Sequence, residues 1–148
     1  MEGIDSILYI CLILPVIPII FAITSKKAKQ FLIYFVIGIS VCFVSAQLNT
    51  ILLNKFHFSF AEFSITISPI NEEILKILPV LFFALVFAQK REELLPLTFA
   101  IGIGFALFEN ILILINNVNN VTIAWAITRG IGASLMHSVC TATITIGI

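Results

Sequence analysis

Long apolar runs, separated by short polar segments, dominate this chain. A helix needs about 20 predominantly apolar residues to cross the roughly 30 Å hydrocarbon core of a bilayer. The runs that meet or approach this length predict helices at 7–24, 31–53, 69–88, 94–115 and 121–148. We therefore expect an all-α fold, a polytopic transmembrane helix bundle of about five spans.

The composition places these helices in lipid. The chain has 148 residues, of which 60% are hydrophobic and 11% charged, against roughly 25% charged in a typical soluble domain. Its mean hydropathy is +1.16. A soluble globule of this length could not bury so much apolar surface, so we expect a multi-pass protein of the cell membrane with the lipid bilayer as its surroundings.

Charge and cysteine content exclude other classes. Net charge is zero and no large basic block occurs, so nothing indicates a nucleic-acid partner. The three cysteines have no metal-ligand or CxxC spacing, and we interpret them as small packing residues (Cys11, Cys42 and Cys140).

No repeat, low-complexity segment or long linker divides the chain, so we expect a single integral membrane domain over residues 1–148. The acidic leader "MEGIDS" is unlike a cleaved signal peptide. The sequence stops inside an apolar run, "CTATITIGI". Either the last helix ends at the membrane, or further spans belong to a longer parent chain.

The basic residues predict an orientation, because cytoplasmic loops carry an excess of lysine and arginine. The loops at 24–30 and 89–93 are two spans apart and should both face the cytoplasm. The N-terminus and the loops at 54–66 and 116–120 should then face outside. The basic residues on which this depends are Lys26, Lys27, Lys29, Lys90 and Arg91.

Six ionisable residues interrupt the predicted spans. Such groups are costly at bilayer depth unless they are paired or hydrated, so they are functional hypotheses by default. They fall on three separate segments, which is more informative than six on one segment. They are Glu72, Glu73, Lys76, Glu109, Arg129 and His137.

The first group has two interpretations. Ser68 can cap a helix whose first position is Pro69, and Lys76 is spaced to pair with Glu72 or Glu73, which gives a stable helix start and no more. Alternatively, the two adjacent carboxylates perform acid–base chemistry, for which their proximity and desolvation would prepare them.

The second group lies in the apolar stretch "GIGFALFENILILI". Glu109 has only apolar residues one turn away, so it must find a partner on another helix, find water, or remain a protonated structural residue. Asn110 follows it directly. We expect Gly102 and Gly104 to allow close helix–helix packing rather than to contact a ligand.

The third group is Arg129 and His137. A lone histidine on an apolar face is usually structural, but an imidazole beside carboxylates can form a base and its orienting partner. Arg129 either anchors at the outer interface near Trp125 or neutralises one of the glutamates. Ser134, one turn before His137, is expected only to pack.

Depth provides a further expectation. With a rise of 1.5 Å per residue, Glu73 and Glu109 lie about 6 Å and about 9 Å from the outer ends of their helices. His137 reaches a similar depth, about 10 Å, if its helix begins near Gly130, but lies about 24 Å deep if it begins at Val121. We therefore expect the helix to begin near Gly130, with the preceding residues along the interface. The carboxylates and the imidazole should then meet in one cavity in the outer half of the bilayer.

Three stretches, "NEEILKILP", "GFALFEN" and "RGIGASLMHSVCTA", together resemble the PrsW family of glutamate-dependent intramembrane proteases. The family pattern is EExxK, then FxxxEN, then an arginine followed by a helix with a histidine. The family is related to the CAAX-type prenyl proteases and bacteriocin-processing enzymes (the CPBP superfamily). The resemblance covers residues 68–148, and its residues here are Glu72, Glu73, Lys76, Phe105, Glu109, Asn110, Arg129 and His137.

The resemblance implies hydrolysis of a peptide bond in a transmembrane or lipidated protein substrate, by water that glutamate activates with help from histidine. The implied catalytic residues are Glu72, Glu73, Glu109 and His137. Those implied to bind water or substrate are Asn110, Arg129 and Lys76.

We expect no cofactor. A variant of the mechanism would use a metal ion held by Glu72 or Glu73 together with Glu109 and His137. The alternative function is non-catalytic: a degenerate family member that binds a peptide, or a proton or metal pathway lined by Glu and His. The lack of an inverted repeat disfavours a transporter.

Overall fold

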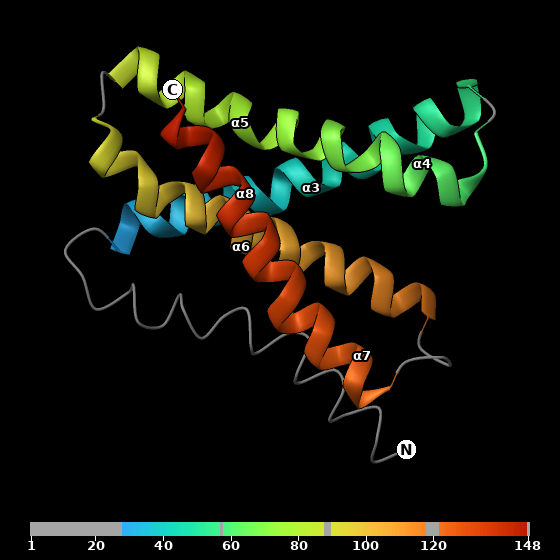
Figure 1. Ribbon diagram of the computed structural model, residues 1–148. Helices are drawn as coiled ribbons and strands as arrows, with labels where there is room; N and C mark the ends of the chain where they lie inside the picture. Colours follow the sequence, from blue (N-terminus) through green and yellow to red (C-terminus); the bar gives the residue numbers. More distant parts are fainter. Residues whose placement is uncertain (1–27, 57, 88–89, 118–121, 148) are drawn as a thin grey trace.

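The computed structural model describes residues 28–56, 58–87, 90–117 and 122–147. Within these ranges the chain is helical and contains no strand (Figure 1), which confirms the all-α expectation. The predicted span at 7–24, with Cys11 and the N-terminus, lies outside the described residues.

Three predicted spans correspond closely to observed helices: α3 (Ala28–Phe56), α5 (Ser68–Phe87) and α6 (Arg91–Asn117). A short helix, α4 (Phe60–Thr66), connects α3 to α5 in the predicted outer loop. Of the described helices, α3 and residues 92–117 of α6 are long and apolar enough to cross a membrane. The structure therefore supports two candidate spans directly, and the expected bundle of about five spans stays a prediction.

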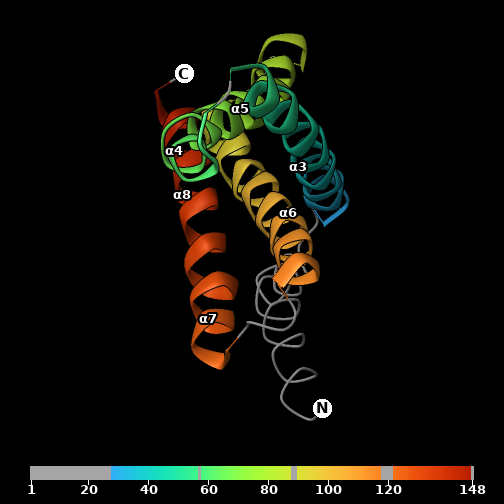
Figure 2. The same cartoon turned by 90° about the vertical axis from the view of Figure 1, so that its right-hand side faces the viewer.

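The last helical segment differs from the sequence expectation. It begins with α7 (Ile123–Ile127), continues through the π-helical η2 (Thr128–Ala133) and ends with α8 (Ser134–Ile146). The residues at both junctions keep right-handed helical backbone angles, and Figures 1 and 2 show one continuous rod. The expectation of a helix beginning near Gly130 was therefore wrong.

The physical reason lies in how the last two rods are placed. In both views α7 extends beyond the end of α6, and the two rods approach each other only farther along, at α8 (Figures 1 and 2). Counting residues from each helix end assumed that both ends lie at the same level. The offset between α7 and the end of α6 brings His137 level with Glu109 without a late helix start.

Helix α6 is the centre of the fold. It packs most extensively against α3 on one side and α8 on the other, as Figure 2 shows. Helix α5 runs antiparallel to both α3 and α6, so that the starts of α3 and α6 lie at one end of the molecule and α4 at the other (Figure 1).

Glycines make these approaches possible. A Cβ at Gly102 would lie 2.5 Å from the Cα of Ser138 in α8, and one at Gly104 would lie 2.1 Å from the carbonyl oxygen of Phe35 in α3. Gly38 of α3 faces the backbone of Ile101 equally closely. The predicted packing role of Gly102 and Gly104 is confirmed.

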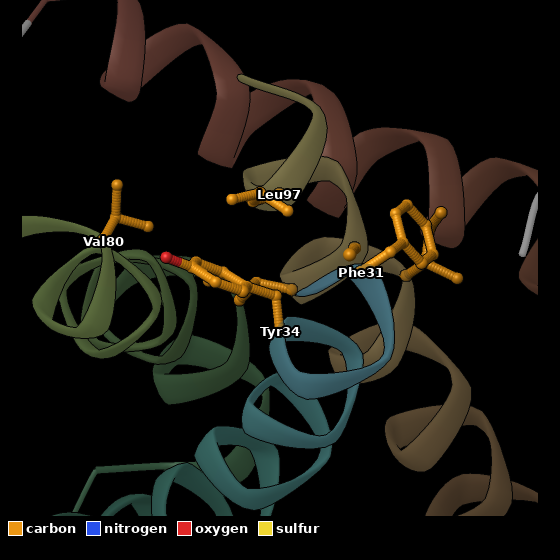
Figure 3. Packing of buried hydrophobic residues seen from close by; sticks show 7 residues of the cluster. Phe31, Tyr34, Val80 and Leu97 are labelled. Atoms are coloured by element: carbon orange, nitrogen blue, oxygen red, sulfur yellow. The ribbon is translucent and has the colours of Figure 1, made fainter. Parts of the chain in front are cut away.

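An apolar core fills the end of the molecule where α3 and α6 begin. Tyr34 packs among neighbours from three helices, including Val80 and Leu97 (Figure 3), and its ring lies 4.8 Å from that of Phe83. Because this core uses the start of α3, the second half of α5 and the start of α6, it leaves the opposite halves of α5 and α6 for polar residues.

Candidate active site

The six ionisable residues singled out in the sequence meet where α5, α6, η2 and α8 approach one another. We call this set the polar cluster: Glu72, Glu73, Lys76, Glu109, Arg129 and His137. Helix α5 contributes three of its members from consecutive turns of its first half. The structure therefore brings together all six, although they come from three separate segments.

His137 joins the two sides of the polar cluster. Its side chain is buried, and its Nε2 lies 3.2 Å from Oε2 of Glu109. Its Nδ1 lies 2.7 Å from Nζ of Lys76 and 3.7 Å from Oε1 of Glu73. The ring of Phe105, the aromatic residue of the FxxxEN motif, packs against the imidazole with ring centroids 4.9 Å apart.

Glu73 lies on the Nδ1 side of His137. Its Oε1 forms an ion pair with Lys76, 2.5 Å away, and its Oε2 accepts a hydrogen bond of 3.3 Å from Thr141 Oγ1 in α8. The sequence spacing allowed Lys76 to pair with Glu72 or with Glu73, and in the structure it pairs with Glu73.

Glu72 has a different environment. Its Oε1 accepts a hydrogen bond of 2.6 Å from Ser68 Oγ and a longer one, 3.4 Å, from Asn49 Nδ2 in α3. Asn49 also donates to Ser68 and accepts from Asn71. Ser68 is the first residue of α5, and its hydroxyl donates a hydrogen bond to the Glu72 carboxylate. It makes this side-chain hydrogen bond in place of the predicted N-cap.

Asn49 and Thr141 were not predicted from the sequence. The signal for Asn49 was a polar amide near the end of an otherwise apolar run. Thr141 gave no distinct signal, because a threonine in an apolar helix ordinarily bonds its own helix, as Thr141 also does to the carbonyl of His137.

Arg129 pairs with Glu109 rather than anchoring beside Trp125, with Nη2 2.8 Å from Oε2. Asn110 is fully buried and donates its Nδ2 to the carbonyl oxygen of Arg129 over 3.2 Å. Among the described residues, Asn110 Oδ1 and Arg129 Nε make no hydrogen bond. One acceptor and one donor therefore stay unsatisfied beside Glu109. The hydroxyl of Ser134 is also buried without a hydrogen-bond partner there, and so makes no bond to His137.

Three residues of the polar cluster could hold a metal ion. Glu72, Glu109 and His137 each offer one ligand atom, and these atoms lie within 4.8 Å of one another. Catalytic zinc sites commonly use three protein ligands of this kind and leave the fourth position open. The donor set therefore fits a single divalent cation, with Glu72 rather than Glu73 as the member from α5.

An apolar groove reaches the edge of the polar cluster between α5 and α8. Its volume is about 470 Å³, and Glu73 is its one charged lining residue beside Pro69, Ile70, Ile74, Ile77 and Ile144. A larger cavity of about 640 Å³, lined by residues including Phe31 and Phe99, lies between α3 and α6 and contains no member of the polar cluster.

Two apolar helices of membrane-spanning length, together with partly buried carboxylates around a buried imidazole, are typical of a helical membrane protein with an internal polar site. The family model described as PrsW family intramembrane metalloprotease matches residues 26–148, and the chain belongs to this family. The match includes α3, which lies outside the residues 68–148 covered by the sequence motifs. Comparisons with curated proteins and with solved structures give no match. Family membership indicates a membrane-bound hydrolase of the intramembrane protease type.

Proposed function

We propose that this protein is an intramembrane endopeptidase in which carboxylates activate water for attack on a peptide bond. One observation carries the proposal: ligand atoms of Glu72, Glu109 and His137, from three different helical segments, lie within 4.8 Å of one another. Several convergent titratable groups suit hydrolysis by activated water.

Glu72 is the proposed general base. Its carboxylate takes a proton from water as the water oxygen attacks the carbonyl carbon, and the proton then passes to the leaving nitrogen as the C–N bond breaks. Glu109 and His137 are hydrogen-bonded to each other, and in this proposal they lie beside the attacking water. Glu73 supports the opposite edge of the imidazole through Lys76.

Asn110 and Arg129 are the proposed substrate contacts. A peptide group has one N–H donor and one carbonyl acceptor. The unsatisfied Asn110 Oδ1 and Arg129 Nε can receive one of each. Arg129 pairs with Glu109 and accepts a hydrogen bond from Asn110 at its carbonyl oxygen, so a peptide bonded to both residues would lie close to Glu109.

A metal ion fits the same residues. The family description names a metalloprotease, and Glu72, Glu109 and His137 would hold the ion. A bound divalent cation supplies Lewis acidity and makes water a stronger nucleophile at neutral pH. The family description and this donor set are the grounds for the metal-dependent variant, and metal analysis of the purified protein decides between it and the cofactor-free expectation.

The substrate we propose is a transmembrane or lipidated protein in the same bilayer, cut near the outer face. This follows from the predicted orientation, with the N-terminus and α4 outside and the basic residues Lys26, Lys27 and Lys29 on the cytoplasmic side. The position of α4 opposite the start of α6 (Figure 1) is consistent with that orientation.

The decisive experiment is cleavage of a candidate membrane-protein substrate by the purified full chain. Glu72→Gln keeps the side-chain volume and should lower turnover by about 10² to 10⁴, the usual effect of losing an acid–base group. Glu62→Gln in α4 is the matched control, because Glu62 is exposed and outside the polar cluster. Binding of the substrate without cleavage by the wild-type chain would support the non-catalytic alternative. Full activity in the Glu72→Gln, Glu73→Gln double variant would end the proposal.

A further inference from the structure

Lys76 is among the largest fully buried side chains of the described residues, with an exposure of 0%. Burial of an ammonium group is costly unless its donors are satisfied. The ion pair with Glu73, one turn earlier on the same helix, explains one of the three donors. A local pair of this kind could form as well at an exposed helix surface, so it does not explain why the ammonium is held inside the molecule.

Two further contacts fix the position of the ammonium. Nζ lies 2.7 Å from Nδ1 of His137 in α8, and it lies 4.3 Å from the centroid of the Phe105 ring in α6. Phe105 in turn packs against the imidazole. Lys76 is therefore held by groups from three helices. One of these groups is His137, and the other two, Glu73 and Phe105, both lie close to its ring.

The chemistry of an ammonium determines the direction of the bond. It has donors and no acceptor, so Nδ1 of His137 must accept the hydrogen bond from Lys76. A neutral imidazole carries its one N–H on the other nitrogen. That nitrogen, Nε2, lies 3.2 Å from Oε2 of Glu109, and a carboxylate oxygen is an acceptor.

We propose that Lys76 is a positioning residue that selects the tautomer of His137 with the proton on Nε2. In this tautomer His137 donates to Glu109, and its ring is held between an ammonium and a carboxylate. The assignment depends on the contacts of Lys76 alone. Its relevance to catalysis rests on the proposed function.

The selected tautomer limits what His137 can do. To act through Nε2 as a base or as a metal ligand, the imidazole needs that nitrogen free of its proton, and Nδ1 would then carry the proton. The hydrogen bond from Lys76 to Nδ1 would have to break. Glu73, with Oε1 3.7 Å from Nδ1, is the carboxylate placed to accept from Nδ1, as carboxylates do behind metal-bound histidines. Lys76 therefore opposes the tautomer that Glu73 would favour.

Nitrogen-15 NMR of histidine-labelled full chain tests the assignment directly. The chain has two histidines, so His57→Gln leaves His137 as the only labelled ring. In an otherwise wild-type chain without added metal, Nδ1 should give the signal of an unprotonated nitrogen and Nε2 that of a protonated one. A protonated Nδ1, alone or together with Nε2, would overturn the proposal without any further variant.

Substitutions then test whether Lys76 is the cause. Lys76→Met should remove the preference for the tautomer with the proton on Nε2. Part or all of the population should then lose the signal of an unprotonated Nδ1. Lys76→Arg, which also only donates, should retain it. Lys55→Met, at the exposed end of α3, is the control. An unchanged spectrum in folded Lys76→Met would contradict the proposal. If that variant does not fold, the wild-type spectrum decides.

The spectrum does not depend on peptide cleavage. A wild-type chain with the expected tautomer but no protease activity would contradict the proposed function and leave the role of Lys76 intact. An active protease whose His137 carries its proton on Nδ1 in the metal-free form would support the proposed function and contradict the role of Lys76.

Discussion

Each carboxylate of the polar cluster bonds to a side chain on a different helix. Glu72 bonds to Asn49 of α3 and Glu73 to Thr141 of α8, while Glu109 reaches His137 and Arg129. Charges left unpaired among apolar helices would cost far more than the pairs gain. The same contacts that make these residues tolerable therefore also place them within reach of one another.

At this scale Glu109 separates the two versions of the mechanism. If it is a metal ligand, Glu109→Gln should lose bound metal and a chelator should inhibit the wild-type chain, because a neutral amide is a poorer ligand than a carboxylate. Elemental analysis of purified wild type, Glu109→Gln and the control Glu62→Gln measures this. Retention of activity in chelator, with Glu109→Gln partly active, would instead support hydrolysis without a metal.

Among the elements, the close contact between α6 and α8 is the one on which the site depends. Gly102 faces the backbone of Ser138, the residue after His137. A methyl group there cannot be accommodated by moving a side chain, because the atoms 2.5 and 2.7 Å away are backbone.

We expect Gly102→Ala to force α8 away from α6, to destabilise the fold by roughly 1–3 kcal/mol, and to separate His137 from Glu109. Gly132→Ala in η2 is the matched control, since its nearest neighbour would be the Thr128 methyl at 4.0 Å. Thermal unfolding in detergent and the cleavage assay measure the two effects. Equal stability of the two variants would show that the helices can adjust.

Helix α4 begins with a capping box that predicts a pH dependence. Ser59 donates from its hydroxyl (2.7 Å) and its backbone N–H (3.3 Å) to Glu62. These hydrogen bonds hold the pKa of the exposed Glu62 carboxyl below its ordinary value.

A carboxyl with a lowered pKa stabilises the folded form above its unfolded pKa, about 4.3, and this stabilisation is lost as the pH falls through the folded value. Hydrogen exchange of the Ser59 amide, corrected for its intrinsic pH dependence, should therefore lose protection below about pH 4. Glu62→Gln, which has no carboxyl to titrate, should abolish this change. The same loss in the Gln variant would assign it to another group.

For the molecule as a whole, the orientation in the membrane decides which side the polar cluster serves. In a cysteine-free background, a cysteine at Glu62 in α4 should react with a membrane-impermeant reagent added outside, and one at Lys90 before α6 should not, because basic loops stay in the cytoplasm. Both residues are exposed, and α4 lies at the opposite end of the molecule from the start of α6 (Figure 1). The reverse labelling would move the proposed site to the cytoplasmic half.

The arrangement of the helices also explains which sequence predictions were correct. Apolar run lengths predicted α3, α5 and α6 to within a few residues, because a long helix depends on the composition of its own segment. The packing of Gly102 and Gly104 was likewise predictable from small residues alone. The start of the last helix was not, because the offset between α7 and the end of α6 is a relation between two segments that neither one encodes.

The sequence by itself determined the helical class, the lipid surroundings, the family motifs and the list of six ionisable residues, since each depends on residue identity and spacing within a segment. Only the tertiary structure decided which charge pairs with which. It pairs Lys76 with Glu73, directs Arg129 to Glu109, and places Glu72 with Glu109 and His137. The physical reason is that, apart from the Lys76–Glu73 pair within α5, these contacts are short-range and join helices that only packing brings together. The two carboxylates of the EE motif are adjacent in sequence, but they face different neighbours.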